Sequence, residues 1–308
     1  MTETRPMIRD FRPADAEAVS AAHRAGREHL VWTAEALLWA NARQNPDEHF
    51  RTFVAELDGR VVGAVRCALA LGTTTTGVGY ANGSVLPEFR RRGAATALLA
   101  AAERHLAAHG VTEMHTLLDE EPDSLAFAAA RGYELGRTAQ FGGRDLTLPL
   151  PEAPLRPAGV ELRPARDWAH DPRPLFLVEA DAIRDEPGEV TMDALDYEEW
   201  LHGDWARPDL DLDLTVVAVV DGEPAAFTVA QTDGVDRYWS AFTGCRREFR
   251  GRGLSKLAKL ESLRLAAAAG YRRAYTSNDT TNAPMLAVNA WLGYERCAGE
   301  RKGIRRLG

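Results

Sequence analysis

The chain has 308 residues, of which 45% are hydrophobic and 27% charged, a composition typical of a globular protein with about two domains. Its formal net charge of −8 disfavours nucleic acid or an anionic membrane surface as a partner. Cys67, Cys245 and Cys297 are too few and too widely spaced for a disulfide framework or a zinc site. The amino terminus lacks the apolar core of a signal peptide, and no apolar stretch approaches the roughly 20 residues that span a bilayer. We therefore expect a soluble, cytoplasmic protein.

The first half of the chain alternates strands with helices. A short strand and one or two helices precede a hairpin, in which the apolar runs 52–57 and 61–69 flank Asp58-Gly59. The next strand ends at an arginine- and glycine-rich run, and the helix after it, at 94–108, has an apolar stripe. A strand at 114–118, a helix ending at Gly132-Tyr133 and closing strands complete the half. This order predicts an α/β (mixed α+β) domain with a central, partly parallel twisted sheet flanked by helices.

The second half of the chain repeats this order. Four segments of the first half recur about 160 residues later, and they begin at Phe11, Asp58, Phe89 and Arg131. The second hairpin turn is Asp221-Gly222, the second long helix is expected at 254–268 and the strand after it at 273–277. A proline-rich stretch at 149–157 is typical of a semi-rigid linker. We therefore predict two domains, 1–150 and 155–308.

The arginine- and glycine-rich run of each copy is the motif that carries chemistry. Arg90-x-x-Gly93-x-Ala95 and Arg250-x-x-Gly253-x-Ser255 each lie between an apolar strand and a helix rich in alanine and leucine. Glycines and small residues let the backbone approach an anion closely, and the helix N-terminus directs free N–H groups toward it. Arginines add charge-assisted hydrogen bonds to phosphate. The pattern predicts a phosphate-binding loop in each half, although one such motif alone is also found in solvated surface loops.

The order of these elements and motifs resembles the GNAT superfamily of acyl-CoA N-acyltransferases, in the tandem arrangement of mycothiol synthase. The resemblance covers nearly the whole chain, once per half, and implies that acetyl-CoA is the cofactor. Its pyrophosphate would lie on the loop, and its pantetheine would pair with the strand before the loop. The residues implied in the second copy are Cys245, Arg246, Arg250, Gly251, Arg252, Gly253, Leu254, Ser255, Asn278 and Asn282. Those implied in the first copy are Val85, Leu86, Arg90, Arg91, Arg92, Gly93, Ala94, Ala95 and Thr96.

The second copy carries more of the family pattern. Asn282 stands where similar proteins contact the cofactor near its thiol end, whereas the first copy has Glu121 at that place. Turn formation or helix capping is the alternative role for Asn278 and Asn282. We therefore expect 155–308 to be catalytic and 1–150 to be a degenerate copy, which either keeps affinity for CoA or serves as structural support.

The catalytic residues are less evident than the cofactor loops. Many family members place a tyrosine, as general acid for the thiolate, where this chain has Ala128 and Asn289. The catalytic candidates near the second loop are Asn282, Tyr238 and Thr243. Tyr238 is alternatively a core aromatic residue.

The acceptor is expected to be a primary amine of a small molecule. The segment 181–213 contains twelve acidic residues against Arg184 and Arg207, together with Tyr197, Trp200 and Trp205. An acidic and aromatic wall suits a cationic amine, and a solvated helix face with a polar loop is the alternative.

Two other functions remain open from the sequence. The missing tyrosines favour a non-catalytic acyl-CoA-binding sensor or scaffold, and the acidic segment allows a protein lysine acetyltransferase. A metal is not expected, because His105 and His109 at i,i+4 lack a third ligand. We expect a monomer or a homodimer, with neither nucleic acid nor membrane as a partner.

Overall fold

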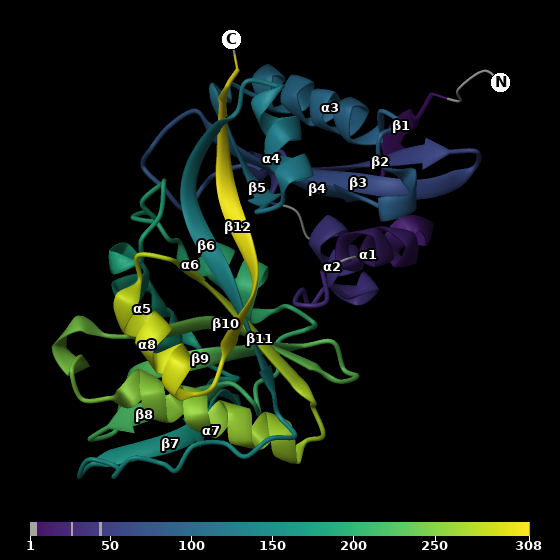
Figure 1. Ribbon diagram of the computed structural model, residues 1–308. Helices are drawn as coiled ribbons and strands as arrows, with labels where there is room; N and C mark the ends of the chain where they lie inside the picture. The colour runs from purple at the N-terminus through teal and green to yellow at the C-terminus, as the bar shows by residue number, and fades with distance from the viewer. Residues whose placement is uncertain (1–4, 26, 43–44, 308) are drawn as a thin grey trace. The chain divides into compact units, whose positions relative to one another are not determined.

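The computed structural model describes residues 5–25, 27–42 and 45–307 (Figure 1). The chain forms two compact units. The first comprises the chain up to Arg137 together with the segment from Glu300 onward, and the second comprises Thr138–Gly299.

The first unit has a mixed sheet with the strand order β1-β2-β3-β4-β5-β12. Neighbouring strands are antiparallel except for β4 and β5, which are parallel. The strands are β1 (Met7–Asp10), β2 (Arg51–Leu57), β3 (Arg60–Leu69), β4 (Val78–Val85), β5 (Glu113–Asp119) and the part of β12 (Glu295–Arg306) that begins at Glu300.

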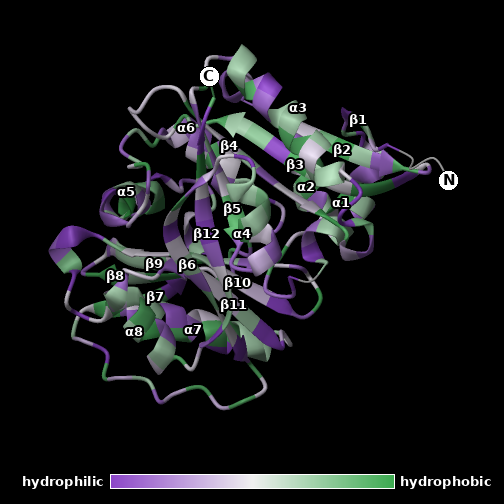
Figure 2. Cartoon of the chain, turned by 45° about the horizontal axis from the view of Figure 1, so that its top comes forward, coloured by the Kyte–Doolittle hydropathy of each residue, from purple (hydrophilic) through white to green (hydrophobic). Residues whose placement is uncertain are grey.

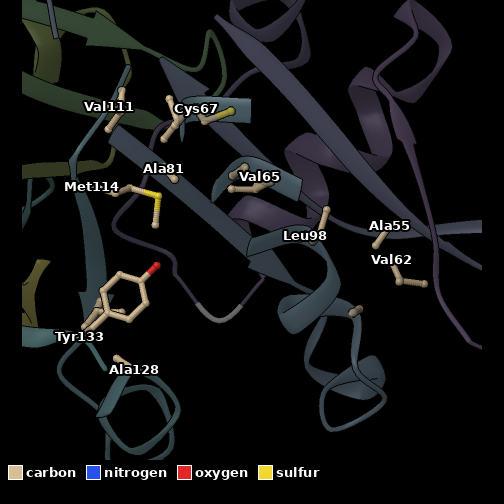
Figure 3. Packing of buried hydrophobic residues seen from close by; sticks show 14 of the residues in the cluster. Ala55, Val62, Val65, Cys67, Ala81, Leu98, Val111, Met114, Ala128 and Tyr133 are labelled. Carbon is tan, nitrogen blue, oxygen red and sulfur yellow. The ribbon is translucent and has the colours of Figure 1, made fainter. Parts of the chain in front are cut away.

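Helices cover both faces of this sheet. In Figure 1, α3 (Ala94–Ala108) lies on one face, whereas α1 (Ala16–Arg24) and α2 (Ala34–Ala42) lie on the other; α4 (Pro122–Ala129) follows β5. Leu98 of α3 packs with Val65 and Met114 in the core beneath α3 (Figure 3). On the other face, Val19 and Leu37 pack against the sheet. Because both faces are covered, adjacent residues of one strand are buried and the apolar run of β3 is continuous rather than alternating.

The second unit repeats the arrangement with the strand order β6-β11-β10-β9-β8-β7. β10 and β11 are parallel and the other neighbours antiparallel. The strands are β7 (Val160–Pro164), β8 (Val216–Val220), β9 (Glu223–Thr232), β10 (Arg237–Cys245), β11 (Arg273–Asp279) and the part of β6 (Glu134–Asp145) that begins at Thr138.

The helices of the second unit also pack on a sheet that is buried on two sides. α7 (Leu254–Ala268) packs on the side of Val216 and Ala218, whereas α5 (Arg173–Ala182) and α6 (Tyr197–Trp200) pack on the side of Val217 and Val219. All of β8 is buried as a result. A short helix, α8 (Ala283–Trp291), follows β11.

The closing strand of each unit comes from the other half of the chain. β6 pairs with β11 from Ala139↔Asp279 to Asp145↔Arg273, and β12 pairs with β5 from Glu300↔Asp119 to Arg306↔Glu113. The units therefore do not follow the predicted boundaries 1–150 and 155–308, because the chain enters the second unit before the proline-rich stretch and returns to the first at its end. β12 is largely hydrophilic in Figure 2, so its sequence contains little to identify its partner strand.

Several predicted elements are confirmed by the structure. Both Asp-Gly pairs form hairpin turns with positive φ, 51° and 76° at Asp58 and Gly59 and 49° and 88° at Asp221 and Gly222. The helices predicted at 94–108 and 254–268 have those limits. Across the described ranges, no helix combines the length and the apolar character that spanning a bilayer requires.

Candidate active site

In the second unit, the parallel strands β10 and β11 separate partway along their length. They pair from Arg237↔Arg273 to Ser240↔Thr276, and both strands continue beyond that point without pairing to each other. A β-bulge between Ser240 and Phe242, in the pairing of β10 with β9, coincides with the separation. The strands thus form a fork at Ser240 and Thr276, where backbone groups of β10 lack a partner strand.

The first unit has a similar fork. β4 and β5 pair only from Val78↔Glu113 to Tyr80↔His115. The Asn82 side chain bridges the next position, because its Oδ1 accepts the Leu117 N–H at 2.8 Å. β4 pairs with β3 without a register shift, so the first fork has no bulge.

Beyond each fork, the residues predicted to pair with the pantetheine differ in the direction of their backbone N–H groups. Leu86 donates its N–H to Val62 O at 2.8 Å, and Arg246 donates its N–H to Ala225 O at 2.9 Å. Backbone groups alternate in direction along a strand, so the preceding residues, Val85 and Cys245, direct theirs to the open side. The structure therefore corrects the expectation for Leu86 and Arg246, whose N–H groups are engaged in the sheet.

The two arginine- and glycine-rich loops follow the same backbone path. φ is −61° at Arg90 and −65° at Arg250, and it is positive at the next residue in both loops, 65° at Arg91 and 77° at Gly251. It is positive again at the helix N-caps, 82° at Gly93 and 73° at Gly253. A Cβ on either N-cap glycine would meet no atom within 4 Å, so glycine is required there for its conformation and not for space.

Free N–H groups follow each of these glycines. The first intrahelical bonds run from Ala97 N to Gly93 O and from Leu257 N to Gly253 O, both at 3.0 Å. The N–H groups of the three residues between are therefore free of intrahelical bonds, at the positive end of a 15-residue helix. In one loop these residues are the predicted Ala94, Ala95 and Thr96. In the other they are the predicted Leu254 and Ser255 together with Lys256, which was not predicted. Such an arrangement fits a pyrophosphate.

The arginines of the two loops differ in their ion pairs. In the second unit, Asp185 accepts from Arg250 at 2.7 Å and from Arg247 at 2.8 Å, and these bonds hold the pKa of that carboxyl well below its usual range. In the described parts of the chain, Arg90, Arg91 and Arg92 form no ion pair. The second loop therefore has an internal anion that competes for its arginine.

The predicted catalytic residues lie in three different environments. Tyr238 is fully buried and its hydroxyl lies 2.7 Å from Ser262 Oγ, and burial raises its pKa to about 12. It is a core residue without access to a ligand, which corrects the predicted catalytic role. Thr243 lies beyond the bulge, with its Oγ1 2.8 Å from Thr228 Oγ1. Asn282 caps α8, since its Oδ1 accepts the Met285 N–H at 3.3 Å.

The cysteine beside the second loop is not an activated nucleophile. Cys245 is half-buried at the end of β10, and burial raises the pKa of its thiol to about 11. A thiolate is the reactive form, so this environment disfavours covalent catalysis.

A buried polar cluster under the second fork was missed by the sequence analysis. Lys259 of α7 is 1% exposed, and its Nζ donates to Asn289 Oδ1 at 2.7 Å and to Thr276 Oγ1 at 3.3 Å. Asn289 in turn donates to Asn278 Oδ1 at 2.6 Å. The available signal was a lysine on the apolar stripe of a helix, four residues before the buried Leu263.

Much of the acidic segment has structural partners. Asp185 pairs with Arg250 and Arg247, Asp209 pairs with Arg207 at 2.7 Å, and Asp196 accepts two N–H groups at the start of α6. Trp200 is buried and donates its Nε1–H to Glu179 at 2.9 Å, and burial raises the pKa of Glu179 to about 8. These contacts reduce the charge left for a cationic ligand. Within the described residues, no group of three or more His, Cys, Asp or Glu side chains is arranged to hold a metal ion.

Residues 17–133 match the Acetyltransferase (GNAT) family. The match lies in the half that the sequence analysis expected to be degenerate. The chain is 29% identical over 222 residues to a mycothiol acetyltransferase from Nocardioides sp.. The aligned region covers 68% of this chain and 74% of that protein.

Solved structures share the fold along the whole chain. A GCN5-related N-acetyltransferase from Sphaerobacter thermophilus has a TM-score of 0.73 at 21% identity, covering 98% of this chain and 96% of its own. A tandem GNAT protein from the clavulanic acid biosynthesis pathway also has a TM-score of 0.73, at 23% identity, covering 99% of each chain. The predicted tandem fold is therefore confirmed.

Proposed function

We propose that the chain is a tandem GNAT protein that acts as an acetyl-CoA-dependent N-acetyltransferase on a primary amine of a small molecule. The family match of residues 17–133, the similarity to a mycothiol acetyltransferase and the tandem fold support this proposal. Acetyl-CoA supplies an acyl group activated as a thioester. The amine nitrogen forms a bond to the acyl carbon, and the bond from that carbon to sulfur breaks. The nitrogen loses one proton and the thiolate gains one, so the products are an amide and CoA.

The observation that carries the proposal is the repeated geometry of fork and loop. In each unit a parallel strand pair opens, and the strand before the loop presents Val85 or Cys245 to the open side. The loop then brings free N–H groups and an arginine together at a helix N-terminus. An elongated ligand fits this arrangement, with its polar amide chain along the open strand edge and its anionic end at the loop.

We assign the transfer to the second unit. Its fork carries the bulge of β10, whereas Asn82 occupies the corresponding position of the first fork. At the start of α8, the Nδ2 of Asn282 makes no hydrogen bond within the described residues, so it is available to a ligand. The loop of the first unit keeps its arginines free of ion pairs, and we propose that it binds acetyl-CoA without turnover.

A non-catalytic acyl-CoA sensor is the second candidate. Position 289 is asparagine and position 128 is a buried alanine, so neither offers the hydroxyl that many family members use as an acid. The ion pair between Arg250 and Asp185 adds a reason for weak binding in the second unit. This candidate predicts binding of acetyl-CoA without consumption.

Release of CoA in the presence of a panel of small amines tests the proposal, with a set of lysine-rich peptides as a parallel panel. We expect release with at least one amine, and its loss in Gly253→Glu. Gly270→Glu is the matched control, because Gly270 also has a positive φ and open surroundings but ends α7 rather than starting it. Binding without release from any amine favours the sensor, and release with peptides alone favours a protein acetyltransferase.

A further inference from the structure

Lys259 is an unusual residue for the interior of a protein. It is 1% exposed between α7 and the sheet, and its ammonium is satisfied by neutral partners, Asn289 and Thr276. A buried charge is costly unless an opposite charge or several hydrogen bonds compensate it. Burial lowers the pKa of Lys259 to about 7.

The groups that face Lys259 leave its positive charge uncompensated. Tyr294 follows α8, and its ring centroid is 5.3 Å from Nζ. Tyr238 of β10 lies near Tyr294. Burial raises the pKa of both tyrosines, so they remain neutral. The charged group next to Tyr294 is Arg144 of β6, a second cation.

The charge lies directly behind the fork of the second unit. Thr276, which accepts from Lys259, forms with Ser240 the last pair before β10 and β11 separate, and it donates to Ser240 O at 3.3 Å. Asn289 links Lys259 to Asn278, two residues farther along β11. Two hydrogen-bonded routes therefore run from Nζ to β11, one to Thr276 at the last paired position and one through Asn289 to Asn278 beyond it.

We propose that Lys259 is a positioning residue for acyl transfer in the second unit, where its buried ammonium stabilises the negative charge that forms on the sulfur as the thioester bond breaks. The inference rests on the proposed function of that unit. Lys259 does not touch the substrate: Thr276 and the Asn289–Asn278 pair lie between. The electrostatic attraction between a buried cation and a nearby negative charge is stronger in a low-dielectric interior than in water, so Lys259 does not need to contact the sulfur. Bond breaking leaves the electron pair on sulfur, and the proton comes from solvent or from the amine nitrogen, which becomes cationic once it has attacked the acyl carbon.

Lys259→Met tests the inference, because methionine fills similar volume without charge. We expect kcat to fall about ten- to a hundredfold with little change in acetyl-CoA affinity. In the wild type, activity should decline as pH rises through about 7, where Lys259 loses its proton, and Lys259→Met should lack that decline. Ser262→Ala is the matched control, since it removes a buried hydrogen bond from the same helix and should lower stability without changing the pH profile.

Asn289→Asp provides a second variant. A carboxylate at 2.7 Å from Nζ would raise the pKa of Lys259, so the alkaline decline should move to higher pH while kcat falls. A readout independent of turnover is the thiolate absorbance of bound CoA, which should be greater at a given pH in the wild type than in Lys259→Met.

The outcomes separate this inference from the function on which it rests. Absence of acetyl-CoA binding to the second unit would overturn both. Normal binding and turnover, with Lys259→Met matching Ser262→Ala in pH profile and thiolate fraction, would overturn the role of Lys259 alone.

Discussion

His23 makes the stability of the first unit depend on pH. It is 5% exposed, its Nδ1 lies 2.9 Å from Ser84 Oγ and its ring stacks on Trp32. Its Nε2 is buried and has no hydrogen-bond partner among the residues that the structure describes. Burial, with the nearby Arg66 and Arg27, lowers its pKa from 6.5 to about 3. The folded unit therefore binds fewer protons than the unfolded chain.

The sign and size follow from that difference. The stability that depends on neutral His23 is fully present above the unfolded pKa of 6.5, and it is lost progressively as the pH falls toward 3. At pH ~5 the unfolded chain is mostly protonated at this position and the folded one is not, which costs about 2 kcal/mol. Glu300 of the same unit acts in the opposite direction, because burial raises its pKa to about 7.

Comparison with His23→Gln isolates the histidine from Glu300. Hydrogen exchange of peptides from β3 and β4 measures the opening free energy of this unit alone. We expect the wild type to lose about 2 kcal/mol of opening free energy relative to His23→Gln between pH ~7.5 and pH ~5, and the control variant His109→Gln, which keeps His23, should show the same loss as the wild type. An equal pH dependence in the wild type and His23→Gln would refute the burial argument.

Four further variants test the loops and the helix cap. Gly253→Glu and Gly93→Glu place a bulky anion at a positive φ in the loops proposed to bind the pyrophosphate, and each should remove acetyl-CoA binding from its own unit in calorimetry. Asp185→Asn should tighten binding to the second unit several-fold at low salt and less at high salt, since Arg250 is then released; weaker binding would mean that Asp185 positions the arginine instead. Asn282→Ala should cost about 1 kcal/mol of stability through the lost cap and should slow turnover by more than that loss explains; an unaltered rate would leave Asn282 as a cap alone.

Local patterns were sufficient to predict the elements and the loops. Asp58-Gly59 and Asp221-Gly222 specify their turns through backbone conformation, which depends on few neighbours. The N-cap glycines Gly93 and Gly253 mark helix starts for the same reason.

The exchange of closing strands could not be predicted in this way. β6 and β12 are rich in glycine and charged residues and lack an alternating apolar pattern, so their sequences do not specify which sheet they complete. The repeat in the sequence correctly indicated two similar units, but the path of the chain between them depends on pairing over long separations.

Tyr238 and Lys259 were misjudged from the sequence because their burial depends on tertiary packing. Tyr238 follows the apolar face of β10 into the core, a position that a tyrosine near a predicted loop does not reveal. Lys259 was passed over because lysines are rarely fully buried, and because its hydrogen-bond partners Thr276 and Asn289 lie 17 and 30 residues away in the sequence.

The central claim is that the loop beginning at Arg250 binds acetyl-CoA in the second unit, with an equivalent site in the first. Calorimetric titration of acetyl-CoA into the wild type and into Gly253→Glu tests it most directly. We expect two equivalents to bind the wild type and one to bind Gly253→Glu. No binding to the wild type, or a stoichiometry that Gly253→Glu leaves unchanged, would contradict the account.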